Sequence, residues 1–210
     1  MKTLEEKIQH ILKIIEREND GTTLDFVVPG YVAKPAVAYQ SMREDLILCR
    51  NAILESLNPA YNEVVKISLF HSVVVIYGKC FTDSTHSKSP KLEISDLGGD
   101  KDLLKSHKEI MDMRHNLVAH RGSIEHDLGF TYLSLDAKTL ARQVRVKQIR
   151  KKGFKIEDYK RYLILIDYLI DVVEKKFAKA AAKIWTHLLE NFKPEQLALL
   201  KIAGPTNEEK

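Results

Sequence analysis

A long run of apolar residues at helical spacing, in the last third of the chain, most constrains what this sequence can fold into. The run predicts one helix from about Glu157 to Asn191, because residues three and four positions apart lie on the same face of a helix. Its expected core-facing stripe is Tyr159, Leu163, Ile166, Ile170, Val173, Phe177, Ile184 and Leu188. No alternation of strands and helices accompanies it, so a doubly wound nucleotide-binding fold is not expected.

Helices are also expected along the rest of the chain, separated by loops such as 22–35. Before the long helix they are predicted over residues 3–18, 36–57, 58–81 and 100–121. Asn58 and Pro59 offer an N-cap and a proline at the first helical position, and Asp100 can cap the helix that follows it. Pro194 opens a short final helix before a tail over 204–210. His71 lies on the apolar helix predicted over residues 58–81.

The pattern changes between the fourth helix and the long one. Residues 130–136 and 141–149 alternate with a period of two, which predicts a β-hairpin within 129–150. We therefore expect a mostly α fold, with a small basic hairpin inserted between two helices. The whole chain, 1–210, is expected to form a single domain in which residues 1–35 make an N-terminal helix and loop. We expect His71 to be a buried core histidine with a satisfied side chain.

The net charge of +4 hides an uneven distribution, because the segment 138–155 contains eight basic residues and no acidic one. The candidate RNA-binding residues in it are Arg142, Arg145, Lys147, Arg150, Lys151 and Lys152. On the second strand Arg145 and Lys147 share one face, while Val144 and Val146 share the other. Such a hairpin can pack its apolar face on the helices and offer cations to phosphates. The alternative is an edge strand that its positive charge protects from aggregation.

The chain shows no recognisable targeting segment. Its first residues are charged throughout, and the most apolar run, 72–77, is too short to cross a bilayer. Cys49 and Cys80 are not spaced as a CxxC pair, and we expect both to be buried free thiols in a reducing compartment. These features predict a cytoplasmic location and no membrane partner.

The stretch M-R-H-N-L-V-A-H-R-G, residues 113–122, is the most informative part of the sequence. Its predicted helix has an apolar stripe made of Leu103, Ile110, Met111, Leu117 and Val118. Arg114 falls in the middle of that stripe, with His107 close to the same line, and a guanidinium there needs a carboxylate, a partner chain or a solvent-filled cleft. His120 lies about 120° further round the helix. The two side chains therefore meet only through distortion near Gly122 or across a subunit interface.

The pattern R-H-x4-H over residues 114–120 resembles the motif of the HEPN superfamily (higher eukaryotes and prokaryotes nucleotide-binding domains). The longer string R-H-N-L-V-A-H-R is similar to the form found in abortive-infection members, with Asn116 where lysine is common. The order of elements is similar too, with helices before the motif, the motif near a helix end, and a long helix after it. Arg121 and His126 make a second, looser match.

The resemblance implies a HEPN-like helical bundle and metal-independent RNA cleavage in a cleft between the two chains of a homodimer. His120 would move a proton between the 2′-hydroxyl and the leaving oxygen, and Arg114 would stabilise the charge on the scissile phosphate. His115, or Asn116 behind it, would orient the phosphate or the catalytic histidine, with Arg121 in support. The implied products are a 2′,3′-cyclic phosphate and a 5′-hydroxyl.

The resemblance alone also implies toxin or phage-defence activity and a neutralising partner protein. Two other functions stay open. One is the same fold without catalysis, binding RNA, a nucleotide or a protein partner. The other is a structural helical protein, in which Arg114 and His120 form a dimer contact or a solvated helix end. Neither a cofactor nor a metal is expected, because the spacing of His115 and His120 does not place two ligands on one helix face.

Overall fold

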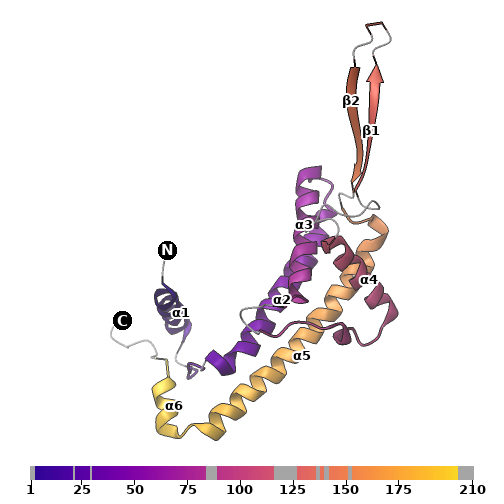
Figure 1. The fold of residues 1–210 in the computed structure, drawn as a ribbon. Coiled ribbons are helices and arrows are strands. Elements are labelled where there is room, and N and C mark those ends of the chain that lie inside the picture. Colours follow the sequence, from indigo (N-terminus) through magenta and orange to yellow (C-terminus); the bar gives the residue numbers. More distant parts are fainter. Residues whose placement is uncertain are drawn as a thin grey trace. The chain divides into compact units, whose positions relative to one another are not determined.

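The computed structural model describes residues 3–20, 22–28, 30–83, 89–115, 127–135, 138–139, 142–150 and 153–202. Within these residues the chain is mostly helical and carries one two-stranded antiparallel sheet, as predicted (Figure 1). The elements are α1 (Leu4–Glu18), α2 (Gly30–Ser56), α3 (Glu63–Cys80), α4 (Lys101–Met113), β1 (Asp127–Leu135), β2 (Arg142–Arg150), α5 (Tyr159–Asn191) and α6 (Pro194–Leu200). None of the helices in this part of the chain is both long and apolar enough to cross a membrane.

Local capping explains where several helices begin. Thr3 and Glu6 form a capping box at the start of α1, in which each side chain accepts a hydrogen bond from the backbone N–H of the other residue. Asp100 caps α4, as predicted, and accepts hydrogen bonds from the backbone N–H groups of Asp102 and Leu103 at 2.9 and 3.0 Å. Gly98 and Gly99 precede this cap with φ angles of 63° and 76°, which favour glycine. A single turn of 3-10 helix, Ile94–Leu97, comes before the glycines.

Two predicted helix starts are wrong. The second helix begins at Gly30, within the expected loop 22–35, and it contains Pro35 although proline removes one backbone hydrogen bond. The helix after Asn58 begins at Glu63 instead, because Asn62 caps it by accepting a hydrogen bond from the backbone N–H of Val65 at 3.0 Å. Asn58 accepts one from the N–H of Ala60 at 3.0 Å and so closes a turn. Both asparagines suit a cap, and the sequence does not distinguish them.

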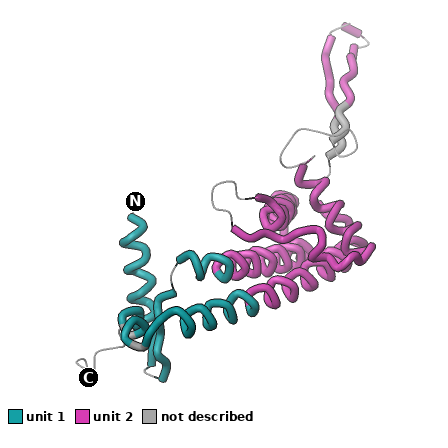
Figure 2. The backbone as a smooth tube through the Cα atoms, turned by 60° about the horizontal axis from the view of Figure 1, so that its bottom comes forward, with its two compact units in different colours: residues 1–36, 178–210 teal, residues 37–177 magenta. Residues whose placement is uncertain are grey.

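The chain divides into two compact units (Figure 2), which are Met1–Ala36 with Ala178–Lys210, and Val37–Phe177. In the first unit, residues from the two ends of the chain pair through an isolated antiparallel β-bridge between Phe26 and Lys201. The Tyr31 hydroxyl and the His187 ring also form a hydrogen bond of 3.1 Å, which ties the start of α2 to the end of α5. None of the residues of α1 is buried.

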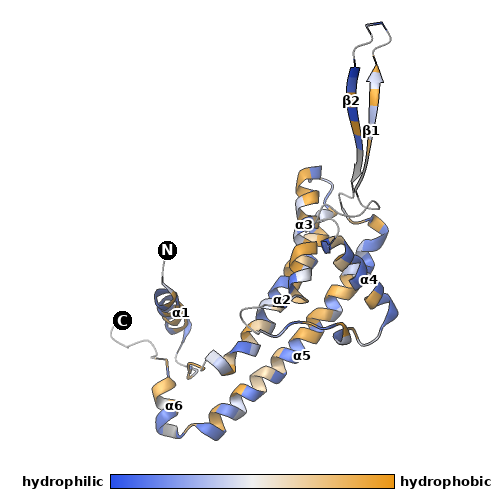
Figure 3. Ribbon diagram, viewed as in Figure 1, coloured by the Kyte–Doolittle hydropathy of each residue, from blue (hydrophilic) through white to orange (hydrophobic). Residues whose placement is uncertain are grey.

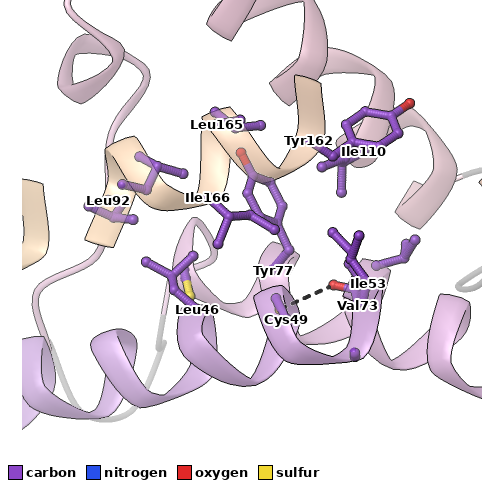
Figure 4. Close-up of a cluster of buried hydrophobic side chains, with 14 of the residues drawn as sticks. Leu46, Cys49, Ile53, Val73, Tyr77, Leu92, Ile110, Tyr162, Leu165 and Ile166 are labelled. Atoms are coloured by element: carbon purple, nitrogen blue, oxygen red, sulfur yellow. Dashed lines mark hydrogen bonds between the residues drawn. The ribbon is translucent and has the colours of Figure 1, made fainter. Parts of the chain in front are cut away.

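The second unit contains the main apolar core, to which α2, α3, α4 and α5 all contribute (Figure 4). Its fully buried large side chains include Leu46, Ile53, Phe70, Tyr77, Ile110, Tyr162, Leu165 and Ile166. Cys49 and Cys80 are free and buried, as predicted, and the Cys49 thiol donates a hydrogen bond to the Val73 carbonyl at 3.7 Å. Burial raises the pKa of both thiols, that of Cys80 to about 12. They therefore act as small apolar core residues rather than as nucleophiles.

The buried stripe of α5 differs in part from the predicted one. Its buried residues in the second unit are Tyr162, Leu165, Ile166, Leu169 and Val173. Of the predicted stripe, Ile166 and Val173 are in this set, whereas Phe177 is 37% exposed. The first turns of α5 are apolar at almost every position, so their periodicity fits more than one stripe. Packing against α2, α3 and α4 selects which of them is buried.

Candidate functional site

Arg114 lies directly after α4 and its side chain packs on α3 at Gly78. A Cβ atom added to the buried Gly78 would overlap the Cδ and Nε atoms of Arg114. The missing side chain therefore makes the space that the stem of the arginine fills. The backbone N–H of Arg114 donates to the carbonyls of Ile110 and Met111, which continues the helical hydrogen bonding of α4. The apolar stripe predicted for this helix is partly confirmed, because Leu103 and Ile110 are buried.

A cluster of rings lies beside this contact, on the same faces of α3 and α4. His107 is seven residues before Arg114, which places the two side chains within about 20° of each other around the helix. The His107 ring packs on Phe81 with a centroid distance of 4.4 Å, and its Nδ1 forms a hydrogen bond of 2.8 Å with the Tyr77 hydroxyl. Burial lowers the pKa of His107. The cluster thus keeps a neutral imidazole inside the contact between the two helices.

Arg114 is half-buried as a residue, and its guanidinium forms no ion pair with any described carboxylate. The sequence allows three environments for this guanidinium, namely a carboxylate, a partner chain or a solvent-filled cleft. Within the ranges that the structure covers, no carboxylate pairs with it. The contact with Gly78 fixes the aliphatic stem of Arg114, while the charge of its guanidinium remains available to another anion. A phosphate is an anion that a guanidinium binds well. His115 follows it and is exposed. The other candidate catalytic and supporting residues, Asn116, His120 and Arg121, lie outside the described residues.

Helix α4 is attached to α5 by a half-buried polar cluster. Arg161 donates a hydrogen bond to Glu109 and forms an ion pair with Asp158 at 2.9 Å. The Tyr162 hydroxyl donates to the same Glu109 oxygen at 2.9 Å. Burial raises the pKa of Glu109, but the hydrogen bonds from Arg161 and Tyr162 outweigh it and hold the pKa below its ordinary value. This cluster helps to fix the helix that carries Arg114.

The register of the hairpin defines a second candidate site. Phe130 lies opposite Lys147 and Tyr132 lies opposite Arg145, and directly opposed residues of an antiparallel pair lie on the same face. These four residues, here called the aromatic–basic face, combine two rings with two cations. Phe130 is 67% exposed. The two rings are nearly parallel, at 21°, with centroids 6.3 Å apart. Figure 3 shows strongly hydrophilic positions along β2.

The other side of the hairpin is an apolar face, defined by Leu133, Leu135, Val144 and Val146. All four residues are more than half exposed, so the expectation that this face packs on the helices is wrong for the described residues. Arg142, opposite Leu135, also lies on this side, away from Arg145 and Lys147. Arg150 pairs with Asp127 at the end of the sheet. Lys151 and Lys152 lie outside the described residues.

Sequence reasoning missed three residues of these sites, namely Gly78, Phe130 and Tyr132. A glycine within an apolar helix was a signal for Gly78, since glycine lowers helix stability unless a close contact needs the space. Alternation places Phe130 and Tyr132 on one face of β1, but only the register of the hairpin places them beside Arg145 and Lys147. His71, expected in the core, is exposed. Among the histidines that the structure describes, His107 is the buried one.

Comparison of the chain with family models, with curated proteins and with solved structures gives no match. Among the residues that the structure describes, no group of three or more histidine, cysteine, aspartate or glutamate side chains is placed to hold a metal ion. The fold and the two candidate sites thus define a mostly helical protein with a fixed arginine at the end of α4 and a basic hairpin that carries an exposed phenylalanine and a half-buried tyrosine on one face.

Proposed function

We propose that this chain is a metal-independent endoribonuclease of the HEPN type, which acts as a homodimer. The observation that carries the proposal is the placement of Arg114, whose stem is fixed against Gly78 while no described carboxylate neutralises its charge. A fixed cation of this kind stabilises the negative charge that develops on a phosphate during RNA cleavage. The assignment of His120 rests on the resemblance of residues 114–120 to the family motif.

In the proposed reaction, His120 removes the proton of a ribose 2′-hydroxyl, and the resulting oxygen attacks the adjacent phosphorus atom. The bond from phosphorus to the 5′-oxygen breaks, and that oxygen receives the proton that His120 took up, so the products are a 2′,3′-cyclic phosphate and a 5′-hydroxyl. Arg114 binds the phosphate oxygens throughout. His115, or Asn116, orients the phosphate or His120, and Arg121 supports them.

The test is incubation of the purified chain with end-labelled RNA in the presence of EDTA. Wild-type protein is expected to cleave and to leave a cyclic phosphate, and Arg114→Ala and His120→Ala are each expected to lower the rate by about 100-fold or more. The matched control is His71→Ala, an exposed histidine on α3, which is expected to cleave like the wild type. Circular dichroism checks that each variant is folded. Undiminished cleavage by His120→Ala overturns the proposal.

A second candidate function is RNA binding without catalysis, and the aromatic–basic face favours it. The test is the double charge reversal Arg145→Glu with Lys147→Glu, which is expected to weaken RNA binding and to reduce its salt dependence by about 0.7 for each phosphate contact that is lost. Arg142→Glu, on the opposite face of the same strand, is the matched control. Equal losses in the control and the double variant would contradict a role for this face.

A toxin or phage-defence role, with a neutralising partner protein, is the biological setting that the resemblance to abortive-infection members suggests. Expression of the wild-type chain in a bacterial host is then expected to stop growth, and expression of His120→Ala is not. Equal growth of both cultures, at equal protein levels, would contradict this role while leaving the cleavage assay to decide the chemistry.

A further inference from the structure

The aromatic residues of the hairpin lie outside the buried core, and Phe130 is exposed whereas Tyr132 is half-buried. Phe130 is 67% exposed, and the apolar residues on the opposite face, such as Leu133 and Val144, are 61% and 68% exposed. Packing in the buried core therefore does not account for two aromatic residues at alternate positions of β1. Exposed rings beside cations are the combination that binds the bases and phosphates of single-stranded nucleic acids.

The spacing of the rings favours bases that are not stacked on one another. The centroids of Phe130 and Tyr132 are 6.3 Å apart, whereas successive nucleotides of a duplex strand are separated by about 3.4 Å along the helix axis. Paired bases also hide their faces inside the stack, and proteins that bind double-stranded RNA contact mainly its backbone and 2′-hydroxyls. Two rings at this spacing fit neighbouring bases of an extended, unpaired strand.

The charges on the same face complete a site for such a strand. Lys147 and Arg145 lie opposite the two rings, one cation to each ring. Gln143, on the same face, accepts a hydrogen bond from Nε of Arg145 at 2.9 Å and so orients its guanidinium. The only acidic residue of the two strands is Asp127, which pairs with Arg150 at the end of the sheet. The phosphates of a bound strand would therefore meet positive charge beside each stacked base.

We propose that the aromatic–basic face stacks two consecutive unpaired bases on Phe130 and Tyr132, with Arg145 and Lys147 on the adjoining phosphates. Resting on the proposed nuclease function, this assigns single-stranded RNA as the substrate class. The face acts in substrate binding and not in the chemical step, because it contains no group that we assign to proton transfer.

The first experiment measures the affinity of the full-length His120→Ala chain for a single-stranded oligouridine and for an RNA duplex of equal length. Single-stranded RNA is expected to bind more tightly. The parent chain is then given two further substitutions, Phe130→Val and Tyr132→Val, because valine keeps a high strand propensity. Each lost stack is expected to weaken the binding of single-stranded RNA by about 5-fold or more, so the double variant should lose about 25-fold or more. Leu133→Ala on the apolar face is the matched control and should bind like the parent.

The second experiment reports stacking directly and does not depend on a variant that loses binding. The single natural tryptophan, Trp185, is replaced by phenylalanine, and Phe130→Trp then puts the only indole on the aromatic–basic face. Oligouridine is expected to quench its fluorescence in proportion to binding, and the duplex is not. Equal quenching by both RNAs, or none by oligouridine, overturns the proposal.

Cleavage assays separate this proposal from the proposed function. In the catalytically intact chain, the double valine variant is expected to raise KM for single-stranded RNA by about 25-fold with little change in kcat. Cleavage that needs His120 but shows an unchanged KM in the valine variant overturns the stacking proposal and leaves the nuclease intact. The opposite result is a wild-type chain that binds single strands preferentially but does not cleave them. It would support base stacking on the aromatic–basic face and contradict the proposed nuclease function.

Discussion

At the scale of single residues, the absence of one side chain decides where the candidate catalytic arginine lies. Gly78 lies in the last turn of the apolar helix α3, and within a helix alanine is more stable than glycine by up to about 1 kcal/mol. The stem of Arg114 occupies the space in which an alanine methyl group would lie. The hydrogen atom that Gly78 has in place of a methyl group thus helps to determine where the charged side chain of Arg114 lies.

Gly78→Ala is expected to move Arg114 from its place. Overpacking costs about 1–3 kcal/mol, which is partly offset by the better helix propensity of alanine. We expect a net loss of about 1–2 kcal/mol in the free energy of unfolding, measured by urea denaturation, together with weaker RNA cleavage. Gly30→Ala is the matched control, because nothing lies within 4 Å of a Cβ at that helical position. A stable and fully active Gly78→Ala chain would contradict the assigned contact.

His107 gives a second prediction at this scale. Burial lowers its pKa in the folded state, so the unfolded chain takes up a proton first as the pH falls below the ordinary histidine value of about 6.5. Stability is then lost by up to about 1.4 kcal/mol per pH unit, until the lowered pKa is reached. His107→Asn, which can keep a hydrogen bond to Tyr77, is expected to flatten this dependence between pH 7 and 5. The free energy of unfolding as a function of pH provides the measurement.

The exposed His71 serves as the control for that series. His71→Asn, on the surface of α3, is expected to keep the pH dependence of the wild type. A wild-type slope in His107→Asn would show that other groups cause the loss.

The two histidines also show a limit of prediction from sequence, because an apolar run such as α3 does not reveal which of its positions face solvent. The buried histidine, His107, lies on α4. The sequence predicts that His107 and Arg114 lie on the same side of this helix, and this is confirmed because both side chains contact α3.

At the scale of elements, the contact between α4 and α5 depends on polar groups as well as on apolar ones. Glu109 accepts hydrogen bonds from both Arg161 and Tyr162. The side chains of Glu109 and Arg161 are 34% and 30% exposed, so solvent reduces the strength of their interaction without removing it. The arrangement fixes the helix from which Arg114 extends.

Glu109→Gln is expected to lower the free energy of unfolding by about 1–2 kcal/mol, because it removes the charge that both donors share. Glu174→Gln is the matched control. Glu174 also pairs with an arginine, Arg43, at 2.7 Å, but both side chains are more exposed, and surface pairs contribute at most about 1 kcal/mol. Urea denaturation of the two variants side by side makes the comparison, and equal losses would show that the cluster acts as an ordinary surface pair.

The elements also show what could be predicted and what could not. Helices were predicted correctly where local signals suffice, as with the periodicity of residues 3–18 and the cap at Asp100. They were misplaced where two asparagines compete, as at Asn58 and Asn62, since the choice depends on the packing of the whole helix. The hairpin itself was predicted by its alternation. Its aromatic–basic face was not, because the pairing of Tyr132 with Arg145 depends on a register that neither strand specifies alone.

At the scale of the whole molecule, the two compact units differ greatly in how much apolar surface they bury. Nearly all of the buried apolar side chains belong to Val37–Phe177. In the other unit, the buried apolar residues among those described are Ala36, Ala180 and Leu188. The helix expected over residues 3–18 forms as α1, but its apolar residues Leu4 and Ile11 are 76% and 55% exposed. Periodicity therefore predicted the helix correctly, while it could not tell whether anything covers its apolar face.

This difference predicts unequal local stability. Helices of about 15 residues are marginal in water unless tertiary packing supports them, so α1 is expected to open on its own and to exchange its amide hydrogens rapidly. The amides of α3, which carries Phe70, Val73 and Tyr77 in the core, should exchange only through global unfolding. Hydrogen exchange measured by mass spectrometry at rising urea separates the two, since global exchange accelerates with denaturant and local opening does not. Equal protection of α1 and α3 would contradict independent opening, and protection of α1 that falls on dilution would place its apolar stripe against a second copy of the chain.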